Sequence, residues 1–306
     1  MINNAKRTFI SMLKEIASEE NIRLITFSYD WMGVLEKDGK RGAFWGYQLP
    51  ENRAGAHLIA KDKSATYELL TKSGVPAVPH FLFITPEEFA FLGVQSNWDG
   101  IYALLEKYGK IVLKPNEGTG GESVLLAKTK GETELAAGRI FQKYRTLAVS
   151  PYLDIQAEYR VVVSGEKVKL TFSKRRPAVV GDGKRNVFAL AAEKYRNAEL
   201  TTDGAYVPKE GEEVLLTWHH NLGKGGYAER VTDNAVLEKL TPLALSAAKA
   251  MGLDLCSVDI VFSEGKYAVL EINSGVMTEF FARESEENYQ TAKEIYREAI
   301  LRYFEK

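Results

Sequence analysis

The alternation of apolar and polar residues predicts helices and short strands that follow one another along the whole chain. Apolar residues recur at helical spacing over residues 9–16, and a β-rich run follows at residues 22–27. An apolar stripe over residues 289–303 predicts a helix at the end of the chain. Residues 29–60 combine aromatic side chains with turn formers, and we assign no chemistry to them. The pattern therefore predicts a mixed α and β protein.

Two further apolar runs, residues 257–262 and 267–272, flank the segment 263–265. A three-residue loop with glycine at its left-handed position is a common hairpin connection, so we predict that the runs pair antiparallel. If Phe262 faces Lys266 across this loop, side-chain alternation places three oxygen-bearing side chains on one sheet face. These side chains are Asp259, Glu271 and Asn273.

Carboxylate and amide oxygens on neighbouring strands suit a hard cation. Mg²⁺ commonly takes one or two carboxylates and leaves its other positions to water and substrate phosphate. The alternative is that Asp259 and Glu271 are exposed charges at a sheet edge. Because both interrupt apolar runs, where an unpaired buried carboxylate is costly, we favour a metal and a nucleotide.

A glycine-rich turn, PNEGTGG at residues 115–121, is the second chemical candidate. Its backbone N–H groups can surround phosphate oxygens, and Lys114 at the end of the preceding strand can reach the same phosphates. The turn is not a P-loop, because no Gly-Lys-Ser/Thr follows and no helix begins there. An ordinary flexible hairpin tip is the alternative, and the turn alone does not decide between them.

The densest basic segment, residues 174–177 with 184–185 beyond it, follows a predicted core strand. A run of charges is usually a solvated face. Because glycine and proline interrupt this one, a site for phosphate or a substrate carboxylate has equal weight. A second glycine-rich loop, residues 221–226, adds a cation and an amide. The adjacent His219 and His220 would point to opposite faces of a strand, which argues against a zinc site.

Composition narrows the class of protein. With 306 residues and 45% apolar content, the chain can bury a core and divide into two or three subdomains. Forty Lys plus Arg against 41 Asp plus Glu provide no overall field for nucleic acid or an anionic membrane. The lone Cys256 and the lack of a long apolar run predict a reducing compartment without signal or anchor. We expect a globular cytoplasmic protein that binds neither nucleic acid nor membrane.

Several motifs together resemble the ATP-grasp superfamily, and more closely the ligases related to cyanophycin synthetase and the RimK-type amino-acid ligases. In chain order the matching segments are KDKSATYELLTKSGVPAVP, IVLKPNEGTGGESV, VVGDGKRNVFAL, VPKEGEEVLLTWHHNLGKGGYAERVTD, MGLDLCSVDIVF and LEINSG. The resemblance covers roughly residues 58–280. It implies an α+β ATP-grasp fold at 61–306, in which two subdomains clamp ATP, with a lid subdomain at about 77–153. A small N-terminal α/β domain at 1–60 would precede it.

The resemblance also implies roles for individual residues. The ATP contacts would be Lys63, Lys114, the lid residues Glu117, Gly118, Thr119, Gly120 and Gly121, the segment Pro151, Tyr152 and Leu153 beside adenine, and Asp154 near the ribose. The Mg²⁺ ligands would be Asp259, Glu271 and Asn273. The transferred phosphoryl group or an acidic substrate would face Arg160, Arg175, Arg176 and Lys224, with Asn221 beside them. Ser274 and Gly275 would contact the substrate where many relatives have a Pro-Gly turn.

The implied chemistry joins a carboxylate to an amine through an acyl phosphate, with release of ADP and phosphate. Mg²⁺ and basic side chains would neutralise the transferring phosphoryl group, and the lid would exclude water. We expect a stand-alone ligase for small carboxylate and amine substrates, amino acids or peptides, and the sequence is compatible with a homodimer. The alternatives are an ATP-grasp kinase and a nucleotide-binding module without turnover.

Overall fold

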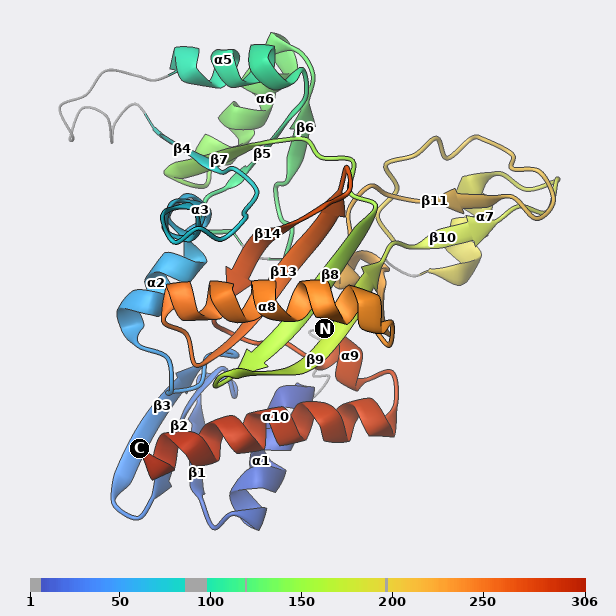
Figure 1. Ribbon diagram of the computed structural model, residues 1–306. Helices are drawn as coiled ribbons and strands as arrows, with labels where there is room; N and C mark the ends of the chain where they lie inside the picture. Colours follow the sequence, from blue (N-terminus) through green and yellow to red (C-terminus); the bar gives the residue numbers. More distant parts are fainter. Residues whose placement is uncertain (1–6, 86–97, 119, 196–197) are drawn as a thin grey trace.

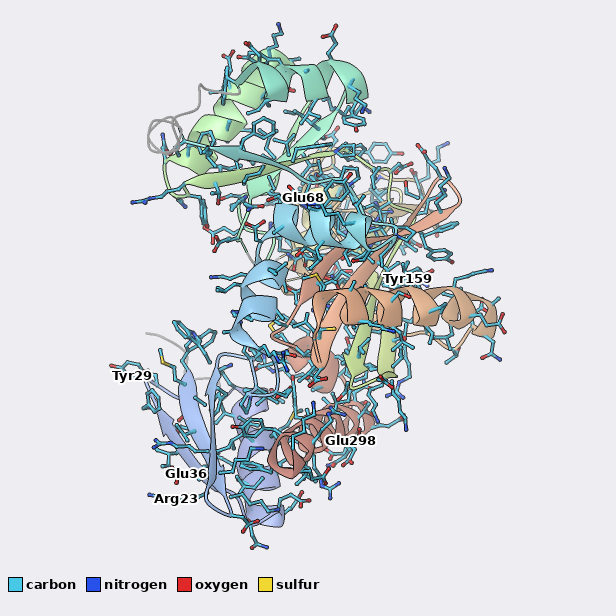
Figure 2. The ribbon with its side chains drawn as sticks, turned by 60° about the vertical axis from the view of Figure 1, so that its left-hand side comes forward. Arg23, Tyr29, Glu36, Glu68, Tyr159 and Glu298 are labelled. Atoms are coloured by element: carbon cyan, nitrogen blue, oxygen red, sulfur yellow. The ribbon has the colours of Figure 1, made fainter. Side chains whose placement is uncertain are left out.

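The computed structural model describes residues 7–85, 98–118, 120–195 and 198–306. Figure 1 shows three tiers: a small sheet with helices at the top, a larger sheet in the middle, and a third sheet at the bottom beside the C-terminal helix. Figure 2, turned by 60°, shows the same three tiers from the side. None of the helices in these ranges has the length and apolar content needed to cross a membrane.

The middle tier is a five-stranded antiparallel sheet. Its strands are, in spatial order, β12 (Tyr227–Arg230), β9 (Lys167–Arg175), β8 (Ala157–Ser164), β13 (Leu255–Ser263) and β14 (Lys266–Asn273). Helix α8 (Asn234–Met251) covers one face, where Val161, Val163 and Val258 are buried. The other face is apolar at one end, with Val162 and Phe172, and carries charges at the other.

The hairpin between β13 and β14 differs from the prediction in its turn. Ser263, rather than Phe262, pairs with Lys266. The turn therefore has two residues, Glu264 and Gly265, whose φ angles are 50° and 74°. Two positive φ values in a two-residue loop match the twist of the flanking strands, so this is a stable hairpin connection. The predicted three-residue loop was wrong.

A β-bulge compensates for the shorter turn. Continued without interruption, the observed pairing would set Asp259 opposite Leu270 and put Glu271 on the other face. A register shift between Asp259 and Ile260 instead pairs Asp259 with Glu271. The three oxygen-bearing side chains thus share one face as predicted, but the bulge and not the loop length is the reason.

In the part of the chain that the structure describes, the upper tier is a four-stranded antiparallel sheet with two helices packed on it. Its elements are β4 (Phe81–Ile84), α5 (Trp98–Tyr108), β5 (Ile111–Pro115), β6 (Leu125–Ala127), α6 (Lys130–Phe141) and β7 (Thr146–Pro151). The strands bury Leu113 and Leu147 against Ile101 and Ile140 of the helices in a core of their own. This tier lies within the range predicted for the lid subdomain, whose boundaries stay a prediction.

The lower tier is an antiparallel meander with a helix on one side. Its elements are α1 (Thr8–Glu19), β1 (Arg23–Phe27), β2 (Met32–Lys37) and β3 (Lys40–Trp45). Because short turns join these strands, they cannot form the parallel crossovers of an α/β unit, so the α/β class we predicted for residues 1–60 was wrong. Figure 2 shows Arg23 and Glu36 on the side of the meander that faces away from the helices.

The lower tier shares its core with the end of the chain. Phe9 and Phe44 belong to the same hydrophobic cluster as Tyr296 and Ile300 of α10 (Glu286–Glu305). The short helices α2 (Ala54–Lys61) and α3 (Lys63–Lys72) then lead up to the lid, and α9 (Glu279–Ala282) precedes α10. The domain boundary predicted near residue 60 stays a prediction.

A small extension projects sideways from the middle tier (Figure 1). It comprises β10 (Ala178–Val180), α7 (Val187–Lys194) and β11 (Glu213–Leu215), followed by a short 3₁₀ turn, η1 (Leu222–Lys224). Val179, Val187, Leu190 and Leu216 form its small core. The extension returns the chain to the middle tier just before β12.

Candidate active site

A cluster of paired, buried charges lies on the free face of the middle sheet. The Arg160 guanidinium donates from Nε and Nη2 to the two oxygens of Asp259, each at 2.7 Å. Lys174 Nζ donates to Asp259 Oδ2 at 2.7 Å and to Glu158 Oε1 at 2.6 Å. Burial by itself would raise the pKa of Asp259, but Arg160 and Lys174 hold that pKa well below its usual range. The carboxylate is therefore charged although no part of it reaches solvent.

Two lysines from distant parts of the chain converge on Glu271. Lys114 is the buried side chain near the end of β5, and Lys63 begins α3. Burial, and then the nearby Lys63 ammonium, lower the pKa of Lys114 to about 8, while Glu271 and Glu158 oppose this shift. Burial also lowers the pKa of Lys63, again with Glu271 opposing. Two repelling ammonium groups held together in a buried place suit an anion with more than one charge.

Glu271 and Asn273 lie side by side at the edge of this cluster. Asn273 Nδ2 donates to Glu271 Oε1 at 3.3 Å. This hydrogen bond uses neither the amide oxygen of Asn273 nor the second carboxylate oxygen of Glu271. Ser257 pairs with Asn273 in the sheet, and its buried hydroxyl has no hydrogen-bond partner among the residues that the structure describes. Asp259 pairs with Glu271 two residues further along β13. These four side chains form a polar row on this face of the sheet.

The glycine-rich turn lies against Lys63 and the second glycine-rich loop. Lys63 Nζ donates to the Gly118 carbonyl at 2.6 Å. Asn221 Nδ2 donates to the Gly120 carbonyl at 2.8 Å, and Lys224 Nζ donates to that of Gly121 at 3.3 Å. The structure thus brings together two loops that the sequence singled out separately.

Close packing explains one glycine of this turn. Gly121 has a φ of 70°, and a Cβ there would lie 2.7 Å from Asn221 Nδ2. Glu117 turns away toward α2, where its carboxylate lies 3.6 Å from Lys61 Nζ. Thr119, another predicted lid residue, lies outside the described residues.

The segment predicted to lie beside adenine connects the upper and middle sheets. Pro151 ends β7, and Tyr152 N–H donates to the Lys110 carbonyl at 3.0 Å. The Tyr152 ring meets Trp218 edge to face, with centroids 5.7 Å apart. Leu153 is half-buried, and the Asp154 carbonyl accepts a hydrogen bond from Ser263 Oγ at 2.9 Å. An aromatic wall therefore stands at the junction of the two sheets.

The structure does not bring Arg175 to the charge cluster. Residues alternate along β9, so Lys174 points to the face of Asp259 and Arg175 to the opposite face. There Arg175 pairs with Glu229 at 2.5 Å. Arg176 follows the strand, and all three basic residues, Lys174, Arg175 and Arg176, line a cavity of about 300 Å³. The roles implied for both arginines stay predictions.

Sequence reasoning gave no role of their own to three charged residues of this region, although Lys174 belongs to the basic segment that it singled out. Glu158 lies two residues before Arg160 on one strand, and Lys174 lies two after Phe172, so strand alternation could have placed both. Glu199 gave no such signal because it lies in an irregular segment. Its two oxygens bind Lys224 Nζ at 3.1 Å and His219 Nδ1 at 2.7 Å, which holds Lys224 beside the glycine-rich turn.

Ser274 and Gly275 follow Asn273 and contact the lower tier. Ser274 Oγ lies 2.6 Å from His57 Nδ1, and its carbonyl accepts a hydrogen bond from Asn52 at 3.3 Å. A Cβ at Gly275 would lie 3.1 Å from Gln48 Cγ. The predicted substrate segment is thus held by residues 48–57, to which the sequence gave us no role.

The charge cluster lies on one antiparallel sheet, and a glycine-rich turn that leaves the other lies beside the half-buried Lys63 and follows the buried Lys114. This arrangement is the ATP-grasp fold, as we expected from the motifs. A bifunctional glutathione synthetase from Pasteurella multocida has a similar structure, with a TM-score of 0.57 at 17% identity over 95% of this chain and 44% of that one. A D-alanine–D-alanine ligase from Bacillus anthracis gives 0.55 at 17% identity, over 81% and 70%.

Comparison of the amino-acid sequence shows which ATP-grasp proteins this chain resembles. Residues 209–297 match the RimK-like ATP-grasp domain family. A probable α-L-glutamate ligase from Shewanella loihica is 29% identical over 227 residues, 73% of this chain and 58% of the relative. The glutathione biosynthesis bifunctional protein of Pasteurella multocida is 24% identical over 278 residues, 81% of this chain and 34% of that protein. The chain spans little more than half the length of the first relative, and its resemblance to ATP-grasp ligases is confirmed.

Proposed function

We propose that this chain is an ATP-dependent carboxylate-amine ligase that forms an amide or peptide bond through an acyl phosphate. One observation carries the proposal: Lys63 binds the glycine-rich turn at the Gly118 carbonyl, and the charges of Lys63 and Glu271 both act on the buried Lys114. Relatives named as ligases for glutamate and for glutathione biosynthesis support amide formation over phosphate transfer to a hydroxyl. They also favour a catalyst over a nucleotide-binding module without turnover.

In this proposal the two lysines bind the phosphates of ATP. Each ammonium is destabilised by burial, and the two repel each other. Phosphate oxygens offset both effects. The unfavourable placement of the two ammonium groups in the free protein therefore favours the binding of phosphate. The glycine-rich turn, from Glu117 to Gly121, closes over the phosphates, while Tyr152 and its neighbours lie beside adenine.

The residues present also fit Mg²⁺. Mg²⁺ usually takes one or two carboxylates with substrate phosphate, and Glu271 and Asn273 offer a carboxylate and an amide oxygen side by side. Asp259 already accepts three hydrogen bonds and keeps one lone-pair position, so it serves as a third ligand or as an anchor. When bound, the ion would neutralise negative charge on the transferring phosphoryl group.

The chain's own residues then act on the reaction in two steps. A substrate carboxylate oxygen attacks the γ-phosphorus and ADP leaves; an amine nitrogen next attacks the acyl carbon, loses a proton, and phosphate leaves. Arg160 and Lys174 hold the Asp259 carboxylate charged and in place beside the first step, and Asn221 and Lys224 help to hold the turn closed. Excluding water is necessary because water would hydrolyse the acyl phosphate.

Production of ADP tests the proposal directly. ADP release should require Mg²⁺ and should rise above background only when an acid and an amine are supplied together. Mass spectrometry should then detect the amide, with one phosphate released for each ADP. A phosphorylated product without amide would favour a kinase, and ADP release at background across a panel of amino-acid pairs would contradict the proposal. We also infer amino-acid or peptide substrates and a cytoplasmic location.

A further inference from the structure

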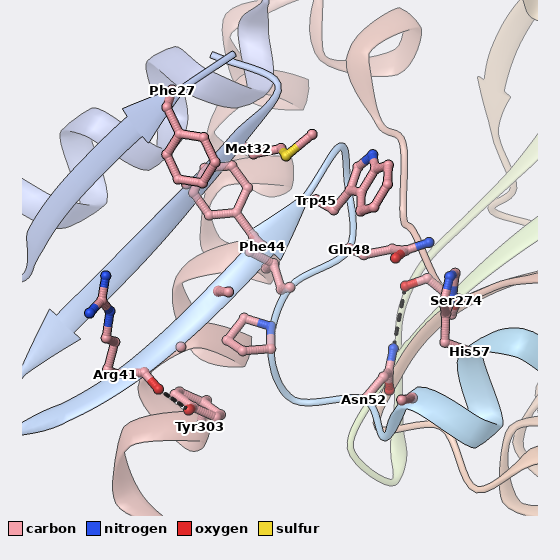
Figure 3. Close-up of a pocket in the computed structure, with 16 residues that line it drawn as sticks. Phe27, Met32, Arg41, Phe44, Trp45, Gln48, Asn52, His57, Ser274 and Tyr303 are labelled. Carbon is pink, nitrogen blue, oxygen red and sulfur yellow. Dashed lines mark hydrogen bonds between the residues drawn. The ribbon is translucent and has the colours of Figure 1, made fainter. Parts of the chain in front are cut away.

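A cavity of about 540 Å³ begins at Ser274, the residue after Asn273, and extends along the lower tier (Figure 3). Phe27, Met32 and Trp45 lie opposite one another on three adjacent strands and border it. The segment that follows β3 and the start of α2 complete its walls. The cavity therefore reaches the residue that follows the proposed metal ligand Asn273 but belongs to a different tier.

The walls of this cavity are mainly apolar and aromatic. Phe27 and Trp45 leave 48% and 62% of their surface in solvent, which is unusual for rings of this size. Among the sixteen lining residues, all within the described ranges, none is Asp or Glu. Arg41 is already paired with Glu36 at 3.2 Å. The cavity thus offers much apolar surface, and the one guanidinium in its walls is largely exposed and shares Glu36 with Arg23.

The end of the cavity nearest Asn273 is polar and fixed. Asn52 Nδ2 donates to the carbonyls of Ser274 and Leu255, and its Oδ1 accepts the Asp254 and Leu255 N–H groups. His57 holds the Ser274 hydroxyl at 2.6 Å. Asn52 and His57 therefore hold in place the main-chain segment that directly follows the proposed metal ligands.

Helix α2 connects this polar end to the lid. His57 and Lys61 lie four residues apart and so share one face of the helix. His57 contacts Ser274 at the cavity, and Lys61 pairs with Glu117 of the glycine-rich turn. A molecule seated in the cavity would thus lie along the same helix face that borders the proposed phosphate site.

We propose that this cavity binds the apolar side chain of one of the two substrates, an amino acid or short peptide with an aromatic or branched aliphatic side chain. Its reacting group would lie at the Ser274 end, beside Asn273. An acidic side chain would bind less well than an apolar one, because the walls are mainly apolar and the guanidinium of Arg41 is largely in solvent, where it shares Glu36 with Arg23. The inference rests on the proposed ligase function, since it names the substrate class of that site.

Calorimetry with phenylalanine, leucine, glycine and glutamate, in the presence of ADP and Mg²⁺, tests the inference without turnover. Phenylalanine and leucine should bind at least ~10-fold more tightly than glycine or glutamate, because each apolar carbon that the cavity removes from water contributes to the binding free energy. Trp45→Ala should weaken phenylalanine binding by ~10-fold and leave ADP binding unchanged. Phe188→Ala is the matched control, because Phe188 is an exposed ring on α7, outside the cavity.

A second variant fills the cavity instead of enlarging it. Ala43 lines the cavity from an exposed position on β3, so Ala43→Trp should abolish phenylalanine binding while circular dichroism and ADP binding stay unchanged. Equal binding of phenylalanine and glutamate, or unchanged binding in both variants, would overturn the inference.

The same preparations separate this inference from the proposed function. ADP release with acid and amine pairs is measured alongside binding. Turnover without preference for apolar side chains would contradict the cavity assignment and leave the ligase intact. Selective binding of phenylalanine without any amide product would contradict the ligase and leave the cavity as a binding site.

Discussion

The two regions that meet at the end of β14 are built in opposite ways. Asn273 faces a cluster in which the buried Asp259 pairs at 2.7 Å with the buried Lys174 and the half-buried Arg160. Ser274, one residue later, borders a cavity whose aromatic walls stay open to solvent. Ligand binding at the cluster would depend on the charges and distances of its side chains. Ligand binding in the cavity would depend on its shape and apolar surface area. We infer that the first region performs the chemistry and the second selects the substrate.

This difference predicts unequal tolerance to substitution. Removing one partner of a buried ion pair leaves the other charge without solvent or counter-ion, which is costly. Truncating a ring that is already half in solvent costs little stability. Changes in the cluster should therefore impair turnover or folding, while changes in the cavity should alter selectivity only.

The largest effect should come from Glu271→Ala. Loss of a carboxylate that holds Mg²⁺ at the phosphates should reduce ADP release by ~10²–10³-fold, the usual cost of removing one electrostatic contact to a transition state. The melting temperature should change little, because Glu271 is only partly buried. Glu166→Ala, at an exposed turn, is the control. Activity equal to that of the parent would remove Glu271 from the site.

A large loss of stability should follow Lys174→Met. The substitution keeps the length of the side chain but leaves Glu158 and Asp259 without their shared ammonium. Urea unfolding should show a loss of about 3 kcal/mol, as for other broken buried pairs. Trp45→Ala, measured in parallel, should lose less than about 1 kcal/mol. Equal losses in the two variants would show that the cluster and the cavity do not differ as we describe.

A smaller effect should appear in the pH dependence of nucleotide binding. Lys114, which faces Lys63, Glu271 and Glu158, has its pKa lowered to about 8, so the free protein loses this proton above pH 8. Phosphate favours the protonated form, and binding must then take up a proton. The Kd for a non-hydrolysable ATP analogue should rise above pH 8, by at most ~10-fold per pH unit.

Lys114→Arg provides the control for this titration, because arginine stays charged across the range. Its Kd should be flat where that of the parent rises. An identical pH profile in the two proteins would assign the titration to another group, of which Lys63 is the nearest candidate.

Strands, turns and candidate binding residues could be predicted from sequence where they depend only on residues close together in the chain. The β13–β14 pairing, the lysine strand ending at Lys114 and the glycine-rich turn were all recognisable from apolar periodicity and residue type. The shared face of Asp259 and Glu271 was predicted for a wrong reason, since a shorter turn and a bulge cancel. Arg175 was preferred to Lys174 because a basic run does not reveal at which residue its strand ends.

The sequence by itself determined the alternating apolar pattern of the sheets and the glycines of the turn. It also determined the chain positions of the side-chain oxygens of Asp259, Glu271 and Asn273, which are suited to a metal ion. Only the tertiary structure decided which cations neutralise Asp259 and which residues hold Ser274. The reason is physical: periodicity and turn chemistry act between neighbours in the chain, whereas ion pairs and cavities join residues such as Asn52 and Ser274 that meet only after folding. Packing against α10 likewise decided that the N-terminal meander would place Trp45 in the wall of the cavity that Ser274 borders.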